Sequence, residues 1–199
     1  MNRFEKVIGN IYRLKVPFEN IYTSVFFIDS KEKKVLIDCA TYPSDVDLYI
    51  IPALRDMGYS LSGTDVIVIS HPHGDHAGGL KRILELCPSI AVVTDIRDLS
   101  SEISTYPLPG HTKDLIGVFD KVSSTLISCD GLQGAGVDKY RCYTECPQEY
   151  LKTLDRLKND KKVENILFSH AYEPWNCENV FGRDNVLSCL DECGKYVKI

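Results

Sequence analysis

The chain has 199 residues, of which 44% are hydrophobic and 26% charged, and these ordinary globular values fit a single domain over residues 1–199. The formal net charge is -5 and no basic stripe is present, which argues against a nucleic-acid binder. No apolar stretch is long enough to span a bilayer, and no apolar signal core follows residues 1–6. We therefore expect a soluble cytoplasmic protein that acts away from membranes.

The cysteine content is high, at eight residues, but no secretion signal accompanies it. Reduced thiols are the default in a reducing cell, so a disulfide framework is not expected. Two pairs are spaced by four residues, Cys142 with Cys146 and Cys189 with Cys193. C-x-x-C spacing is absent, so these pairs fit buried small side chains better than a separate metal site.

Residues 7–38 predict a run of strands. Apolar and polar side chains alternate over residues 11–16, and segments 24–28 and 34–38 flank a polar turn that fits a β-hairpin. Asp38 follows the second of these segments. Two roles stay open for it: a turn or cap residue, or a residue that orients a metal ligand without binding the metal itself.

Residues 45–57 have helical spacing of apolar side chains, with Ser44 as a candidate N-cap and Gly58 at the end. Pro52 within this stretch predicts a kink or an early end. We then expect a strand over residues 65–69, a helix over 77–86 and a second short strand over 90–93. Residues 95–104 show no clear pattern, and residues 105–112 are expected to form a rigid loop with two prolines.

The second half of the chain continues to alternate strands and helices. Two strands are followed by a glycine-containing loop up to about residue 146, and then come a helix whose Pro147 suits its first turn, a last strand and a closing helix. The predicted elements are strands 116–120 and 125–129, helix 147–158, strand 163–168 and helix 185–196.

The most informative stretch is His71-Pro72-His73-Gly74-Asp75-His76, which holds three of the five histidines between a predicted strand and a predicted helix. A lone histidine usually belongs to a solvated polar loop, but four candidate ligands in six positions favour a metal site. In extended backbone, residues i and i+2 point the same way, so His71 and His73 can bind one metal together. Asp75 and His76 are then available for a second metal.

The other two histidines and a further aspartate also lie after predicted strands or in a rigid loop. His111 lies in the proline-containing loop, and Asp130 and His170 each come just after a predicted strand. Sites in layered α/β proteins form where strand ends converge, and a periodic core would not place its histidines this way. Imidazole and carboxylate together suit zinc, iron or manganese.

These motifs resemble the metallo-β-lactamase superfamily. The stretch from His71 to His76 matches the family's H-x-H-x-D-H pattern and is followed by Gly78-Gly79, and the loop histidine, the aspartate and the last histidine come in the family's order. The resemblance covers residues 10–175 approximately. It implies an α/β fold, a four-layer αββα sandwich of two mixed β-sheets flanked by helices, with the site at one edge.

The resemblance also implies roles for individual residues. A first metal ion would bind to three histidines, a second to Asp75 and two histidines, and Asp130 would bridge the ions, while Asp38 matches the family's structural aspartate. The implied ligands of the first ion are His71, His73 and His111, and those of the second are Asp75, His76 and His170. Two zinc ions are the usual content in the family, with iron or manganese as alternatives.

Two departures from the family pattern bear on this assignment. The residue before the bridging aspartate is usually small, often glycine, and here it is Cys129. On a regular strand Cys129 would point away from Asp130, so we expect it to pack rather than bind metal. Glyoxalase II-like members carry a C-terminal helical domain for glutathione, for which the roughly 29 residues after His170 leave too little room.

We therefore expect a binuclear metal-dependent hydrolase, in which a hydroxide held by the two ions attacks a small ester, thioester or lactone and Asp75 also guides the proton. The alternatives are an iron-dependent sulfur dioxygenase with one iron on His71, His111 and Asp130, a phosphodiesterase of the same fold, and a non-enzymatic metal-binding module. The expected partner is a small-molecule substrate, whose identity the sequence leaves open together with the native metal and the oligomeric state. Candidate substrate contacts are Tyr140, Tyr143 and Trp175.

Overall fold

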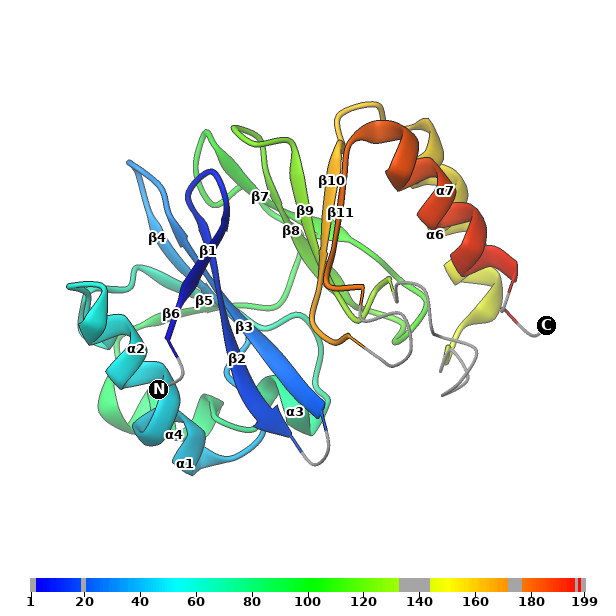
Figure 1. Ribbon diagram of the computed structural model, residues 1–199. Helices are drawn as coiled ribbons and strands as arrows, with labels where there is room; N and C mark the ends of the chain where they lie inside the picture. Colours follow the sequence, from blue (N-terminus) through cyan, green and yellow to red (C-terminus); the bar gives the residue numbers. More distant parts are fainter. Residues whose placement is uncertain (1–2, 19–20, 133–143, 172–176, 196, 198–199) are drawn as a thin grey trace. The chain divides into compact units, whose positions relative to one another are not determined.

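The computed structural model describes residues 3–18, 21–132, 144–171, 177–195 and 197. The chain divides into two compact units, each built on one β-sheet with its own helices (Figure 1). Unit 1 comprises Met1–Thr94 and Leu99–Glu102, and unit 2 comprises Asp95–Asp98 and Ile103–Ile199. A single domain over residues 1–199 stays a prediction.

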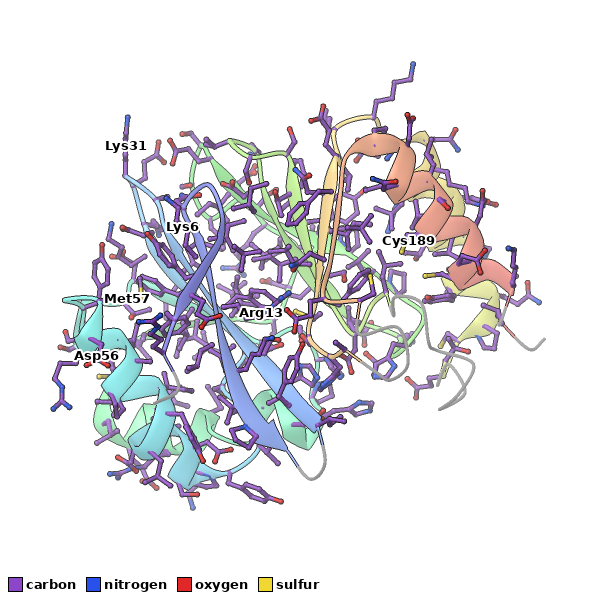
Figure 2. The ribbon with its side chains drawn as sticks, viewed as in Figure 1. Lys6, Arg13, Lys31, Asp56, Met57 and Cys189 are labelled. Carbon is purple, nitrogen blue, oxygen red and sulfur yellow. The ribbon has the colours of Figure 1, made fainter. Side chains whose placement is uncertain are left out.

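Unit 1 contains a mixed sheet of six strands that follow one another in chain order across the sheet. The first four pair antiparallel, and the last three pair in parallel. The strands are β1 (Glu5–Ile8), β2 (Ile11–Phe18), β3 (Ile21–Asp29), β4 (Lys34–Ile37), β5 (Val66–Val68) and β6 (Ala91–Val93). The predicted hairpin is confirmed as β3 and β4, and Figure 2 shows Lys31 extending from the turn between them.

The helices of unit 1 bury their apolar side chains against one face of this sheet. Val46, Ile50, Leu54 and Ile83 from the helices share a core with strand residues such as Phe27. Each large apolar side chain that is fully removed from water contributes about 1.5–3 kcal/mol. The helices are α1 (Pro43–Asp45), the π-helix η1 (Val46–Ile50), α2 (Ile51–Asp56), the 3-10 helix η2 (Leu61–Gly63), α3 (Gly74–Ala77) and α4 (Leu80–Leu86).

The predicted start of the first helix was wrong. The helix begins at Pro43 with Tyr42 as its N-cap, and the Asp45 carboxylate accepts hydrogen bonds from the backbone N–H groups of Thr41 and Tyr42. Ser44 therefore lies inside the helix. Helical backbone also continues through Pro52, because the π-helical turn just before it relieves the clash that a proline ring makes with the preceding turn.

Unit 2 contains a mixed sheet of five strands in the order β11-β10-β9-β8-β7. Only β9 and β10 pair in parallel, and the other neighbours pair antiparallel. The strands are β7 (Ile103–Pro107), β8 (Ile116–Asp120), β9 (Thr125–Cys129), β10 (Asn165–Phe168) and β11 (Asn179–Phe181).

Two helices of unit 2, α6 (Pro147–Asn159) and α7 (Arg183–Lys195), lie side by side next to β10 and β11 (Figure 1). Their buried side chains, among them Tyr150, Leu154 and Leu190, share a core with Ile166 and Phe168 of β10. In Figure 2, Cys189 lies on the side of α7 that faces these strands, and it is buried together with Cys193. This pair is therefore core packing, as predicted, while Cys142 lies outside the described residues.

Two segments of unit 2 differ from prediction. Residues 105–107, expected in the rigid loop, form the end of β7, and Pro107 is tolerated there because β7 is an edge strand. The three residues of β11 were not predicted, since two are only partly buried, Phe181 is exposed, and they show no apolar alternation. Among the described residues, the longest helices are too short and too polar to cross a membrane.

Candidate metal centre

Parallel pairing of β4 and β5 brings the first group of candidate residues to one end of the sheet in unit 1. Ile37 pairs with Val68, so the residues that follow both strands emerge at the same edge. The Asp38 N–H donates to the Val68 carbonyl oxygen at 2.9 Å, and Asp38 has a positive φ of 61°. This left-handed backbone, which costs a non-glycine residue about 1–2 kcal/mol, turns the aspartate toward the residues after β5.

The three histidines of the H-x-H-x-D-H stretch cluster within unit 1. The ring centroids of His71 and His73 are 4.6 Å apart, and those of His71 and His76 are 4.3 Å apart. His73 caps the N-terminus of α3 in extended conformation, so Asp75 and His76 fall in the first turn of that helix. His71 and His76 are buried, while His73 and Asp75 are partly exposed.

Asp38 makes a dense set of hydrogen bonds in this cluster. Its carboxylate accepts from the Ser70 backbone N–H at 2.8 Å and from the Ser70 hydroxyl at 2.9 Å, and it lies 2.7 Å from Nδ1 of His76. The Ser70 Oγ also lies 3.0 Å from Nδ1 of His71. The carboxylate thus contacts the side of His76 opposite Nε2, which is the geometry of a residue that orients a ligand.

The loop after Asp38 is held directly against the segment that carries His76. The backbone N–H and the thiol of Cys39 both donate to the His76 carbonyl oxygen, at 2.8 and 3.2 Å, and burial raises the pKa of that thiol. A Cβ on Gly78 would lie 1.8 Å from the Thr41 carbonyl oxygen, and one on Gly79 would lie 2.2 Å from the Cys39 carbonyl oxygen. The two glycines of the sequence pattern are therefore needed for this close backbone approach.

The second group of candidate residues lies in unit 2, again after two parallel strands. Cys129 at the end of β9 pairs with Phe168 at the end of β10, which brings Asp130 and His170 together. Oδ1 of Asp130 lies 3.3 Å from Nε2 of His170, and Oδ2 of Asp130 lies 3.6 Å from Nε2 of His111. All three side chains are buried.

The backbone at Cys129 departs from a regular strand. Its φ is 48°, and the pairing register with β10 shifts by one residue just before it. The alternation argument for the direction of the Cys129 side chain therefore fails, although the residue is buried as expected. A positive φ explains in physical terms why glycine suits this position in the family that the sequence resembles.

His111 is positioned by a loop that is tied to the start of α6. The Glu145 N–H donates to the His111 carbonyl oxygen at 3.1 Å, and the Cys146 N–H donates to the Gly110 carbonyl oxygen at 3.0 Å. Gly110 has a φ of 153°, and a Cβ there would lie 2.5 Å from the ring of Tyr150. The glycine lets the loop lie flat on α6 and so fixes the histidine.

The carboxylate–imidazole distances fall into two classes. The pair Asp38–His76 is at 2.7 Å, the length of a charge-assisted hydrogen bond. The pairs Asp75–His76, Asp130–His111 and Asp130–His170 are at 3.5, 3.6 and 3.3 Å. Two atoms that each lie 2.0–2.1 Å from one tetrahedral ion are about 3.3–3.4 Å apart. The longer pairs thus have the spacing of two ligands of one metal, and these donors fit a divalent ion.

Comparisons with known proteins agree with this reading of the fold. The crystal structure of DIM-1 metallo-beta-lactamase superposes with a TM-score of 0.77 at 15% identity, covering 98% of this chain and 96% of that one. Residues 20–95 match the family described as the metallo-beta-lactamase superfamily. The chain has the metallo-β-lactamase fold. The predicted fold class, two mixed β-sheets flanked by helices, and the predicted resemblance to this superfamily are both confirmed.

Curated relatives have higher sequence identities than this solved structure, over most or part of the chain. A hydroxyacylglutathione hydrolase of Prochlorococcus marinus is 25% identical over 197 residues, which cover 84% of this chain and 74% of the relative. A ribonuclease Z of Clostridium botulinum is 35% identical over 69 residues, which are 35% of this chain and only 20% of the relative.

The structure places the expected metallo-β-lactamase ligands in two sets, each within its own unit. Unit 1 gathers His71, His73, Asp75 and His76, of which His76 contacts Asp38 directly, and unit 2 gathers His111 and His170 around Asp130. Ser70 and Cys39, which sequence reasoning did not single out, contact these residues directly. The only sequence signal for Ser70 is a hydroxyl side chain immediately before the first histidine. The candidate substrate contacts Tyr140, Tyr143 and Trp175 lie outside the described residues.

Proposed function

We propose that this chain is a metal-dependent hydrolase whose ligands are seven side chains, His71, His73, Asp75, His76, His111, Asp130 and His170. The observation that carries the proposal is the spacing of the carboxylate–imidazole pairs, 3.3 to 3.6 Å, which suits shared coordination better than hydrogen bonding. The structural likeness to metallo-β-lactamases and the sequence likeness to a hydroxyacylglutathione hydrolase support the same reaction class.

The donor set indicates two divalent ions. Seven ligands are more than a single tetrahedral ion uses, and imidazole nitrogen with carboxylate oxygen suits zinc first and iron or manganese as alternatives. When bound, such ions lower the pKa of a water to about 7, which supplies hydroxide at neutral pH. Asp75 and Asp130 bring two negative charges against four positive ones, so the site stays positive and favours the oxyanion that forms at an attacked carbonyl group.

Asp75 is proposed to move a proton as well as to bind metal. Its side chain is 18% exposed, whereas that of Asp130 is 9% exposed. A carboxylate that solvent can reach can exchange a proton during turnover, while the more buried Asp130 is better suited to a fixed ligand role.

The proposed substrate is a small acyl compound, an ester, thioester or lactone. A relative that matches 84% of the chain is named for hydrolysis of an acylated glutathione, which is a thioester, and this supports the acyl class. The ribonuclease Z match over 69 residues favours phosphodiester hydrolysis as the second candidate. The formal net charge of -5 speaks against a polyanionic substrate.

A substrate panel tests this proposal. The protein is stripped with a chelator, reloaded with zinc, iron or manganese, and assayed on one thioester, one oxyester, one lactone and one phosphodiester, with Cys189→Ser on α7 as a control that touches none of the proposed ligands. We expect metal-dependent hydrolysis of at least one acyl substrate at a rate that rises as the pH passes about 7. Phosphodiester cleavage without any acyl activity would overturn the substrate class, and oxygen uptake on a persulfide with iron alone would favour a dioxygenase.

A further inference from the structure

Ser70 occupies a central place in the hydrogen-bond network of unit 1. It is buried, and its hydroxyl oxygen lies between two partners, 2.9 Å from Oδ2 of Asp38 and 3.0 Å from Nδ1 of His71. The same Oδ2 of Asp38 lies 2.7 Å from Nδ1 of His76. One carboxylate oxygen therefore reaches two histidines, His76 directly and His71 through a hydroxyl group.

Counting protons fixes the direction of each hydrogen bond. An ionised carboxylate can only accept, so Nδ1 of His76 must be the donor in its bond to Asp38. The Ser70 hydroxyl has one hydrogen, and the bond to Asp38 uses it. Toward His71 the Ser70 oxygen can therefore only accept, and Nδ1 of His71 must also carry a hydrogen.

We infer that Ser70 is a positioning residue that transmits the orienting effect of Asp38 to His71, so that one aspartate holds His71 and His76 in the same tautomer with Nε2 deprotonated. The inference rests on the proposed function only where it concerns metal affinity. The family resemblance assigns His71 and His76 to different ions. Asp38 therefore supports both ions, whereas Ser70 supports only the ion that His71 binds.

A purely structural serine would behave differently. Ser128 is such a residue in unit 2: it is also buried near the end of a strand, but its hydroxyl donates to a backbone oxygen, that of Leu167, at 3.1 Å. Loss of the Ser128 hydroxyl group should disturb the strand end and leave every histidine tautomer unchanged. Ser128→Ala is thus a matched control for Ser70→Ala.

The test is a two-bond ¹H–¹⁵N correlation spectrum of the metal-free protein, labelled at the histidine rings and recorded at a pH where the rings are neutral. We expect His71 and His76 of the wild-type protein to be protonated at Nδ1. Ser70→Ala should convert His71 to a mixture of tautomers and leave His76 unchanged, Asp38→Asn should alter both rings, and Ser128→Ala should alter neither. A wild-type His71 protonated at Nε2, or an unchanged His71 in Ser70→Ala, would overturn the inference.

Metal titration of the same variants adds a second readout. Loss of a residue that orients a ligand typically weakens metal binding by about 10–100-fold. Ser70→Ala should weaken one zinc-binding step by this factor and Asp38→Asn both steps, while Ser70→Thr, which keeps the hydroxyl, should restore the first. If Ser70→Ala does not fold, the wild-type spectrum and Ser70→Thr still decide the tautomer. A protein that binds no metal but shows the expected tautomers would refute the proposed function and leave this inference standing.

Discussion

Asp38 and Asp130 occupy equivalent positions after strands of the two units, yet the side chains around them differ. Each aspartate directly follows a strand of a parallel pair, and each turn uses a left-handed residue, Asp38 itself in one unit and Cys129 in the other. Asp38 lies 2.7 Å from an imidazole nitrogen that faces away from the proposed ion. Asp130 lies 3.3 and 3.6 Å from two Nε2 atoms.

The difference shows that residue type and strand position alone do not define the role of a carboxylate. A buried aspartate at hydrogen-bond distance stabilises one tautomer of a histidine and holds its ring in place. A buried aspartate at about 3.3 Å or more from two imidazole nitrogens has the spacing of a shared ligand, and a cation bound between these groups would compensate for its burial.

The largest effect is expected for Asp130→Ala. This change removes a carboxylate that lies at ligand distance from two histidines, so metal affinity should fall by more than the about 100-fold that marks the loss of an orienting residue. Cys129→Ser is the neighbouring control and should retain metal. Isothermal titration with zinc compares the two variants, and metal loss in Cys129→Ser with retention in Asp130→Ala would show that the ligand assignment is wrong.

The close approach of the loop after Asp38 to the segment that carries His76 can be tested without changing either side chain. A Cβ on Gly78 would lie 1.8 Å from the Thr41 carbonyl oxygen, so Gly78→Ala must push the loop after Asp38 away and should destabilise the protein by at least about 2 kcal/mol. A Cβ on Gly74 would meet nothing within 4 Å, so Gly74→Ala should be neutral or stabilise by about 0.5 kcal/mol. Urea unfolding measures both, and equal stabilities would contradict the close backbone approach.

The turn before Asp130 offers a smaller test. Because Cys129 has a φ of 48°, Cys129→Gly removes about 1–2 kcal/mol of backbone strain and loses a similar amount of side-chain burial and chain entropy. Its stability should therefore stay within about 1 kcal/mol of the wild type. Cys129→Val places a β-branched residue in left-handed backbone and should cost about 2 kcal/mol or more. A valine variant as stable as the glycine variant would argue against the left-handed turn.

The smallest effect concerns Asp160, an aspartate that accepts a hydrogen bond from a tyrosine. Burial, followed by the hydrogen bond from the Tyr106 hydroxyl to Asp160 at 2.9 Å, raises the pKa of Tyr106 to about 12. A folded-state pKa raised above the unfolded value means that this stabilisation is complete below about pH 10 and is lost as the pH rises through about 12.

The difference between the absorbance titration curves of the wild-type protein and Tyr106→Phe should therefore show one tyrosine that ionises near pH 12. Asp160→Asn should lower that pKa and leave zinc affinity unchanged. A fall in zinc affinity in Asp160→Asn would contradict the proposed difference between aspartates that only accept hydrogen bonds and aspartates that bind metal.

Much of the fold was predictable because alternation and helical spacing are strong in its central elements. Strands β8 and β9 and helix α6 lie where the sequence predicted them, since each combines a clear apolar pattern with a turn or a proline at its start. The short edge strand β11 escaped prediction because an edge strand buries little apolar surface. The start of the first helix was misplaced because a side chain within the helix, Asp45, satisfies the N–H groups before it.

The candidate ligands were predictable for a different reason, since histidine is rare in this chain and every copy follows a strand or lies in a rigid loop. The contacts that position these candidate ligands could not be predicted from the sequence. Ser70 differs from other serines only through its distance to Asp38 and His71, which depends on the register between β4 and β5. The left-handed backbone at Cys129 could not be predicted for a similar reason, because the local sequence does not indicate the shift in register with β10.

The central claim is that the carboxylate–imidazole pairs at 3.3 to 3.6 Å are ligands of two ions. Elemental analysis of protein that is purified without a chelator tests this claim most directly. The predicted result is about two equivalents of divalent metal per chain, because seven ligands exceed what one tetrahedral ion uses. A reproducible value near one equivalent, unchanged after zinc or iron is added, would contradict it.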